Sequence, residues 1–318
     1  MTSGAGISRR TFLTSVAATA VAQALPIPII DAHIHLFDPA RPQGAPYSGP
    51  RPAPGQTPIA AYPDRYRRLA SPLGVVGAIK VEASPWIEDN LWVLEVAERD
   101  PIIVGVVGNL EPEKPEFPEY LDRYHKNPLF RGIRCGNLWG RDIAKQSADP
   151  AFIGGLKRLA DADLVMDTAN PRVSLLEASL RISDAVPRLR IVLDHLPALD
   201  PSKEDQAAYD AALREIGKRP QIFVKLSEII HRVNGQVATD LGASRARLDM
   251  LMGVFGEDRV VFGSDWPNSD GVAPIEQVFA IAKEYFRDKP RTAAEKYFWK
   301  NSVAVYKWIK RDASQPRV

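Results

Sequence analysis

Two histidines separated by a single residue, His33 and His35, close a short apolar run that starts near residue 27. Side chains on a strand alternate between its faces, so a strand here directs both imidazoles to the same side. Two converging neutral imidazoles form half of a site for a divalent metal ion. The alternative is that both histidines only hydrogen-bond to the following loop. The chain has five histidines, and a third, His195, closes another apolar run at residues 191–195, which favours the metal site.

Ionisable residues also close most of the other apolar runs of the chain. One such residue at a strand end usually forms an ion pair or caps a helix, but several that meet in one place indicate a reactive site. The runs that end in this way carry Lys80 and Glu82, Arg134, Asp167, Asp194 and His195, Lys225, and Asp265.

The predicted metal ligands are His33, His35, His195 and Asp265. We expect Asp265 and His195 to act in catalysis, with Asp265 either binding the ion or accepting a proton from water. A divalent ion lowers the pKa of its bound water from 15.7 to about 7, which supplies hydroxide at neutral pH. Imidazole and carboxylate ligands with an open position favour Zn²⁺.

The cationic residues of this set are predicted to bind the substrate. Arg134, Lys80 and Lys225 have the charge to hold an anion or to stabilise a developing oxyanion. Arg134 is the strongest candidate, because a guanidinium binds a carboxylate through two parallel hydrogen bonds. Tyr47 and Trp266 are the aromatic residues expected beside the substrate.

These residues need a scaffold that brings the ends of many strands together. Predicted helices alternate with the strands, at residues 90–99, 118–125, 152–161, 173–185, 205–217, 243–255, 274–282 and 292–309. Apolar strands that alternate with helices form a parallel sheet covered by helices, and eight such units predict a (β/α)8 TIM barrel with its reactive groups at the carboxyl ends of the strands. A doubly wound open sheet would need a glycine-rich phosphate-binding turn, which the sequence lacks. The predicted strands are residues 27–32, 75–81, 102–108, 130–135, 164–167, 190–195, 222–227 and 260–265.

Composition excludes some partners and leaves a small molecule as the expected one. The net charge is +2 and the only basic cluster is at residues 65–68, which we interpret as the solvated face of a helix. Neither nucleic acid nor a membrane surface is indicated as a partner. A single cysteine, Cys135, excludes an intramolecular disulfide.

The first 24 residues have the layout of a twin-arginine export signal. Arg9 and Arg10 precede Phe12 and Leu13, a weakly apolar run follows, and residues 22–24 read Ala-Gln-Ala, a small-residue cleavage site. The alternative is a basic tail. We expect residues 25–318 to form a single domain in the periplasm.

Residues 40–63 are rich in proline and glycine, so they cannot form a helix or a central strand. Long loops of this kind are often functional, and this one directly follows His33 and His35. We therefore expect it to cover the substrate with Tyr47 and Tyr62.

Three motifs in this order resemble the amidohydrolase-2 branch of the amidohydrolase superfamily, in particular its sugar-lactone and 2-pyrone-4,6-dicarboxylate lactonase-like members. They are Asp-Ala-His-Ile-His at residues 31–35, Asp-His at 194–195 and Phe-Gly-Ser-Asp-Trp-Pro at 262–267. The resemblance implies that His33 and His35 are metal ligands, that His195 lies on strand six, and that Asp265 is the acid of strand eight. Because pyrone-dicarboxylate lactonase works without a metal, the resemblance leaves a metal-free mechanism open for this chain.

The resemblance implies a hydrolase that opens an acidic or polyhydroxylated lactone with an activated water. A metal-dependent decarboxylase of an aromatic or dienoic acid is the first alternative. It is disfavoured because such relatives have a histidine ligand on strand five, where this chain has residues Asp167 to Asn170. A non-catalytic exported binding protein is the second alternative, and the presence of both His195 and Asp265 disfavours it.

Overall fold

The computed structural model describes residue 1 and residues 26–50, 57–233 and 235–317. Residues 2–24 of the expected export signal, and residues 51–56 of the expected loop, lie outside the described residues. The described parts of the loop form neither helix nor extended sheet, as predicted, apart from Pro63, which begins the first helix, and one antiparallel bridge between Phe37 and Ala61.

Eight parallel strands form a barrel, which confirms the predicted (β/α)8 architecture. The strands are hydrogen-bonded in chain order from β1 to β7 and then to β10. Backbone hydrogen bonds from Ala32 N to Phe262 O (3.0 Å) and from Asp265 N to His33 O (2.9 Å) join the first strand to the segment after the last. The barrel strands are β1 (Ile29–Ile34), β2 (Val75–Lys80), β3 (Ile103–Gly108), β4 (Phe130–Arg134), β5 (Val165–Asp167), β6 (Arg190–Leu193), β7 (Ile222–Lys225) and β10 (Val260–Val261).

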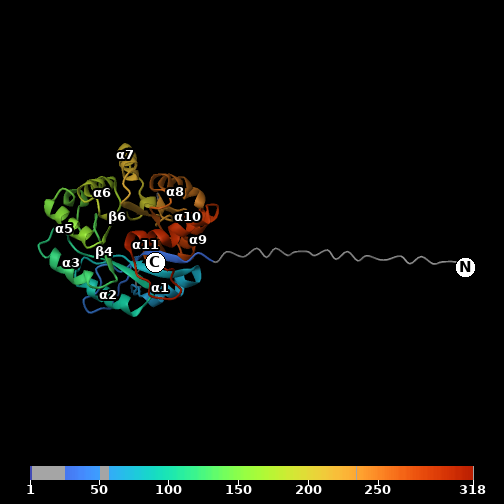
Figure 1. Cartoon of the computed structure of the whole chain (residues 1–318), viewed down its shortest axis with the longest axis horizontal. Helices are drawn as coiled ribbons and strands as arrows, with labels where there is room; N and C mark the ends of the chain where they lie inside the picture. Colours follow the sequence, from blue (N-terminus) through green and yellow to red (C-terminus); the bar gives the residue numbers. More distant parts are fainter. Residues whose placement is uncertain (2–25, 51–56, 234, 318) are drawn as a thin grey trace.

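Helices surround the barrel, and α11 with the C-terminus lies near the centre of the ring they form (Figure 1). The helix α1 carries the basic cluster at residues 65–68, as predicted. The α-helices are α1 (Pro63–Ala70), α2 (Asp89–Arg99), α3 (Phe117–His125), α4 (Ile143–Gln146), α5 (Pro150–Asp161), α6 (Val173–Ala185), α7 (Gln206–Gly217), α8 (Leu241–Phe255), α9 (Ile275–Arg287), α10 (Arg291–Glu295) and α11 (Asn301–Tyr306). Short elements complete the chain: the turns η1 (Ser71–Leu73), η2 (Leu196–Ala198), η3 (Asn268–Gly271) and η4 (Lys296–Lys300), and the hairpin β8 (Arg232–Val233) and β9 (Gln236–Val237).

The buried apolar residues form two clusters on either side of the barrel wall. The outer cluster packs the strands against the helices, and the inner cluster fills the barrel. The C-terminal segment contributes to the inner cluster, so it closes one end of the barrel. The inner cluster consists of Ile30, Ala32, Ile79, Val81, Val104, Val107, Val165, Val192, Phe223, Val261, Val305, Tyr306 and Trp308.

A bulge in β1 turns its histidines into the barrel. Between the pairs Asp31–Ala78 and Ile34–Lys80, β1 advances three residues while β2 advances two. Ile30 and Ala32 point inward before the bulge, so strict alternation would turn His33 outward. The extra residue reverses the pattern, and Ile34 belongs to the outer cluster instead.

Several predicted elements were wrong in extent, the last helix and the last strand among them. The expected helix at residues 292–309 is divided into α10, the π-helical turn η4 and α11, and it ends at Tyr306 because Lys307 has a left-handed backbone (φ 51°). The expected strand at residues 260–265 is regular only over β10. Beyond it the backbone bonds individually to β1, and Asp265 also adopts a left-handed conformation (φ 58°). Among the described residues, none of the helices is long and apolar enough to cross a bilayer.

Candidate active site

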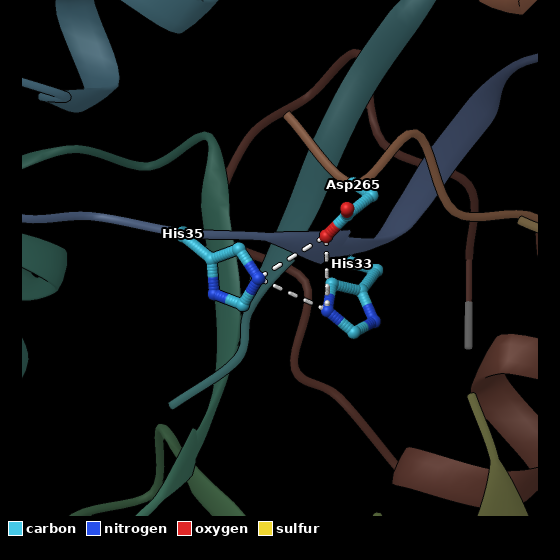
Figure 2. A group of neighbouring side chains, drawn as sticks. All are labelled: His33, His35 and Asp265. Atoms are coloured by element: carbon cyan, nitrogen blue, oxygen red, sulfur yellow. Dashed lines mark hydrogen bonds and ion pairs between the residues drawn. The ribbon is translucent and has the colours of Figure 1, made fainter. Parts of the chain in front are cut away.

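His33, His35 and Asp265 meet at the carboxyl end of the barrel (Figure 2). His35 Nε2 lies 3.1 Å from Asp265 Oδ1, His33 Nε2 lies 3.4 Å from the same oxygen, and the two Nε2 atoms are 3.3 Å apart. All three side chains are buried. Three potential ligand atoms therefore converge on one point.

We call His33, His35 and Asp265 the metal group. Its three donor atoms fit a divalent ion. Ligand atoms at ordinary Zn–N distances on a tetrahedron are about 3.3 Å apart, which the three separations match. His35 Nδ1 lies 3.0 Å from the carbonyl oxygen of Val81. An N–H donated to a carbonyl leaves the lone pair on Nε2, the arrangement usual in metal-bound histidines.

His195 lies beside this group rather than within it. Its Nε2 atom is 3.9 Å from Asp265 Oδ1, and its Nδ1 atom is 2.8 Å from Ser227 Oγ. It combines with His33 and Asp194, or with Glu228 and Asp265, in two further groups that could hold an ion. The structure therefore brings the three predicted histidines close to Asp265.

Unusual backbone conformations aim the side chains of the site. His195, Glu228 and Asp265 all have positive φ values of 56°, 51° and 58°. Such conformations are rare outside glycine and occur frequently at functional sites. Gly263 permits the close approach of strands behind the site, since a Cβ atom there would lie 2.8 Å from His33 Cβ.

The three histidines of the site are held neutral. Burial, followed by the charge of Lys225, lowers the pKa of His33 well below its ordinary value of 6.5. Burial and the charge of Arg134 lower the pKa of His35 to about 3. Burial and the nearby His33 lower the pKa of His195 in the same direction. Neutral imidazoles can ligate an ion or relay a proton.

Two carboxyl groups adjoin at the site. Glu228 and Asp265 lie within reach of a common ion, with ligand oxygens less than 4.8 Å apart. Burial raises the pKa of both above the ordinary values, and the charge of Asp265 raises that of Glu228 further. A buried carboxylate with a raised pKa is a better base than an ordinary aspartate.

A cavity of about 170 Å³ opens in front of the metal group, and we call it the catalytic cavity. Polar and aromatic side chains dominate its wall. Trp139 donates its indole N–H to Glu82 Oε1 (2.8 Å), which holds the ring at the wall. The lining residues are His35, Tyr47, Glu82, Ala83, Arg134, Leu138, Trp139, Asn170, His195, Glu228 and Asn268.

A second cavity of about 270 Å³, here the side cavity, lies beyond Glu228, Asp265 and Asn268. Glu228 and Asn268 line both cavities. The rest of its lining combines the apolar residues Ile230, Val272 and Val278 with the polar residues His231, Arg232, Ser264 and Ser269. Two buried oxygens in its lining, Asn268 Oδ1 and Ser269 Oγ, have no hydrogen-bond partner within the described part of the chain.

Comparison with known proteins identifies the family. The profile of the amidohydrolase family matches residues 30–308. This range includes all eight barrel strands apart from Ile29, the first residue of β1. The chain belongs to the amidohydrolase family. This confirms the resemblance seen in the sequence and the expectation of an enzyme, so the non-catalytic alternative is not retained.

Individual relatives of this amidohydrolase agree with that assignment. It is 30% identical to L-fucono-1,5-lactonase of Burkholderia ambifaria over 247 residues, which cover 76% of this chain and 80% of the relative. An amidohydrolase from Burkholderia multivorans, solved with bound zinc, has the same fold (TM-score 0.77, 24% identity, 89% of this chain and 100% of that chain). So does 5-carboxyvanillate decarboxylase from Sphingomonas paucimobilis (TM-score 0.62, 13% identity, 89% and 100%).

Two predicted substrate-binding residues of the amidohydrolase, Arg134 and Tyr47, do line the catalytic cavity. The guanidinium of Arg134 is largely engaged by the protein. Its Nε donates to Thr168 O (2.9 Å), one Nη donates to Glu82 O (3.3 Å), and the other lies 3.4 Å from Asp194 Oδ2. Tyr62 was expected in the same cavity, but it donates to Asp38 instead and is not in the lining.

Lys225 was predicted at the substrate, but the structure places it outside the lining of the catalytic cavity. Its side chain is fully buried inside the barrel, where Nζ lies 2.5 Å from Asp167 Oδ2, 3.0 Å from Asp194 Oδ1 and 3.2 Å from His33 Nδ1. The last residue of β7 points into the layer beneath the cavity, so it cannot reach a ligand there.

Lys80 was also predicted at the substrate, and its position is on the other side of the barrel wall. Its register partners Ile34 and Val106 both belong to the outer cluster, so Lys80 faces the helices. The strand ends at Lys80, so its alternation does not continue to Glu82, which does line the cavity.

Trp266 is the third predicted substrate-binding residue that does not line the catalytic cavity. It is completely buried, its ring packs 5.2 Å from that of Tyr66, and Arg65 lies over it. The residue after Asp265 points away from the cavity because its backbone N–H donates to Ser264 Oγ (3.1 Å) and its carbonyl accepts from His35 N (2.8 Å).

Sequence reasoning did not assign four polar or aromatic residues to the site. Glu228 directly follows a predicted strand, so the strand-end rule could have included it. Asn170 lies three residues after the predicted strand at residues 164–167, whereas Trp139 and Asn268 stand in loops where no pattern in the sequence distinguishes them from other loop residues.

Proposed function

We propose that this amidohydrolase opens a neutral, polyhydroxylated lactone by attack of a water molecule that Asp265 activates. The observation that carries the proposal is the buried carboxylate of Asp265, which adjoins His33, His35 and Glu228 at a polar cavity. The relatedness to L-fucono-1,5-lactonase of Burkholderia ambifaria supports this reaction class.

In the first step, Asp265 takes a proton from water while the water oxygen attacks the lactone carbonyl carbon. Hydrogen-bond donors around the cavity stabilise the oxyanion that forms. Ser227 can donate to His195 Nδ1, so that Nε2 of His195 carries a proton and serves as one donor. When the bond from the carbonyl carbon to the ring oxygen breaks, Asp265 returns its proton to the leaving alkoxide. The product is a hydroxy acid.

The metal group would hold a divalent ion through His33 Nε2, His35 Nε2 and Asp265. Such an ion lowers the pKa of a bound water and polarises a carbonyl. The imidazole and carboxylate donors suit zinc best. Elemental analysis of the purified protein tests this part of the proposal separately.

The charge of the cavity favours a neutral substrate over an acidic one. Glu82 is in its wall, and Arg134, which also lines it, is already bound to two carbonyls and Asp194. Carboxylates accept hydrogen bonds from hydroxyl groups, amides both accept and donate them, and Trp139 offers an apolar face for a sugar ring.

The residues at the end of β5 do not favour the decarboxylase alternative. Asp167, at the end of β5 where such relatives have a histidine ligand, contacts Lys225 and Tyr306 inside the barrel. It is absent from the groups of described residues that could hold an ion.

A pH-indicator assay with a panel of lactones tests the reaction. We expect acid release from neutral aldonolactones, with much slower release from a lactone dicarboxylate. If no lactone releases acid while an aromatic acid releases carbon dioxide, the proposed reaction is wrong.

We also propose export to the periplasm, supported by the order of Arg9, Arg10, Phe12 and the Ala-Gln-Ala sequence at residues 22–24. Replacing both arginines by lysine is expected to retain unprocessed protein in the cytoplasm. Normal processing of that variant would exclude a twin-arginine signal.

A further inference from the structure

The Nδ1 atom of His33 has two neighbours with opposite requirements. The Lys225 ammonium lies 3.2 Å from it, and Asp194 Oδ2 lies 3.5 Å from it. An ammonium can only donate a hydrogen bond, whereas an ionised carboxylate can only accept one. A neutral imidazole carries one N–H and one lone pair, so Nδ1 satisfies one neighbour at a time.

The shorter contact has the geometry of a hydrogen bond, and the contact to Asp194 is an ion-pair distance only. Lys225 is held rigidly by its other partners. Its Nζ atom contacts Asp167 Oδ2 and Asp194 Oδ1, and Asp167 also accepts from the hydroxyl of Tyr306 (2.9 Å). Two of the three contacts of Nζ, those to Asp167 Oδ2 and His33 Nδ1, have the geometry of hydrogen bonds, whereas the contact to Asp194 Oδ1 is an ion-pair distance.

The direction of this hydrogen bond decides what His33 offers the metal group. If Lys225 donates to Nδ1, the ring proton is on Nε2, the atom that faces His35 and Asp265. A protonated Nε2 has no lone pair for an ion. If the proton moves to Nδ1 it points to Asp194, and Nε2 becomes a ligand.

We propose that Lys225 is a positioning residue that holds His33 in the Nε2–H form and thereby weakens the affinity of the metal group for divalent ions. Asp194 is the acceptor that the ligating form uses instead. The inference concerns only the donor set of the metal group, and it holds whichever substrate is cleaved.

Zinc affinity of the metal-free protein, measured at one pH by competition with a chromophoric chelator, tests the inference. Lys225→Met alone would leave the buried Asp167 without its cation, so it is combined with Asp167→Asn, and Asp167→Asn alone is the matched control. We expect the double variant to bind zinc about 10- to 100-fold more tightly than the control, the usual effect of a residue behind a metal ligand. Equal or weaker zinc binding by the double variant overturns the inference.

Ring nitrogen NMR of the wild-type protein without metal provides a second test, which does not depend on whether the variants fold. Long-range proton–nitrogen correlation distinguishes the two neutral forms of histidine, and His33→Gln identifies the signals of His33 among the five histidines. We expect the Nε2–H form for His33. Finding the Nδ1–H form in the wild-type protein overturns the inference as well.

Discussion

His35 Nε2 and Asp265 Oδ1 lie 3.1 Å apart, although the two residues are separated by 230 positions in the chain. The first and last strands of the barrel are neighbours, so the contact joins the two ends of the fold at the point where water would be activated.

Asp265→Asn is expected to lower kcat by about 10²- to 10⁴-fold with little change in KM, because the amide retains the size of the side chain but cannot accept a proton from water. The rate of acid release from an aldonolactone measures the effect. Asp270→Asn is the control, since Asp270 lies on η3 outside both cavities. A near-normal kcat for Asp265→Asn would exclude it as the base.

The pH dependence of kcat/KM is expected to report the raised pKa of Asp265. Because burial raises this pKa above the ordinary value of 3.8, the base form is lost as pH falls while ordinary aspartates are still ionised. We therefore expect kcat/KM of the metal-free enzyme to decrease with falling pH well above pH 3.8. A rate that stays constant down to that pH would contradict the assignment.

Arg134→Met is expected to destabilise the protein. The guanidinium is the partner of the buried Asp194 carboxylate on the cavity side, and breaking one such buried pair costs about 3–5 kcal/mol. Chemical denaturation measures the loss. Arg131→Met, at a more exposed position of β4, is expected to have a much smaller effect. Equal stability of the two variants would show that the pair with Asp194 contributes little.

Lys80→Met is expected to stabilise the protein at neutral pH without changing KM, because Lys80 lies behind the barrel wall. Burial lowers the pKa of Lys80 to about 8 from 10.5. The unfolded chain binds this proton more tightly, so the free energy of unfolding should increase as pH rises from about 8 to about 10.5. The variant should lack this increase and gain up to about 3 kcal/mol at pH 7. A raised KM would instead support the original substrate-binding assignment.

Val272→Phe is expected to fill the apolar part of the side cavity. If a substituent on the lactone ring occupies that cavity, kcat/KM should fall by about 10- to 100-fold for an alkyl-substituted lactone, and much less for an unsubstituted one of the same ring size. Val233→Phe is the control, because Val233 is exposed on β8 and does not line the side cavity. Equal losses for both lactones would place the substituent elsewhere.

Several features of the amidohydrolase follow from the sequence alone. Apolar strands that alternate with helices can bury both faces of a parallel sheet only in a few architectures, so the barrel was predictable from local patterns. Parallel strands of a barrel end on the same side, so His33, His35, His195 and Asp265 could be assigned to one region without coordinates. The spacing of the two histidines also predicted that they share a face.

The direction of individual side chains depended on the tertiary structure. The bulge in β1 turns His33 and His35 into the barrel, and it exists because β1 and β2 pair with a shift that neither strand encodes by itself. Lys80, Lys225 and Trp266 were misplaced for the same reason, since the face that a strand-end residue occupies depends on where the strand stops and on which layer it reaches. Loop residues such as Trp139 and Asn268 join the site only because folding brings the loops after different strands together around one cavity.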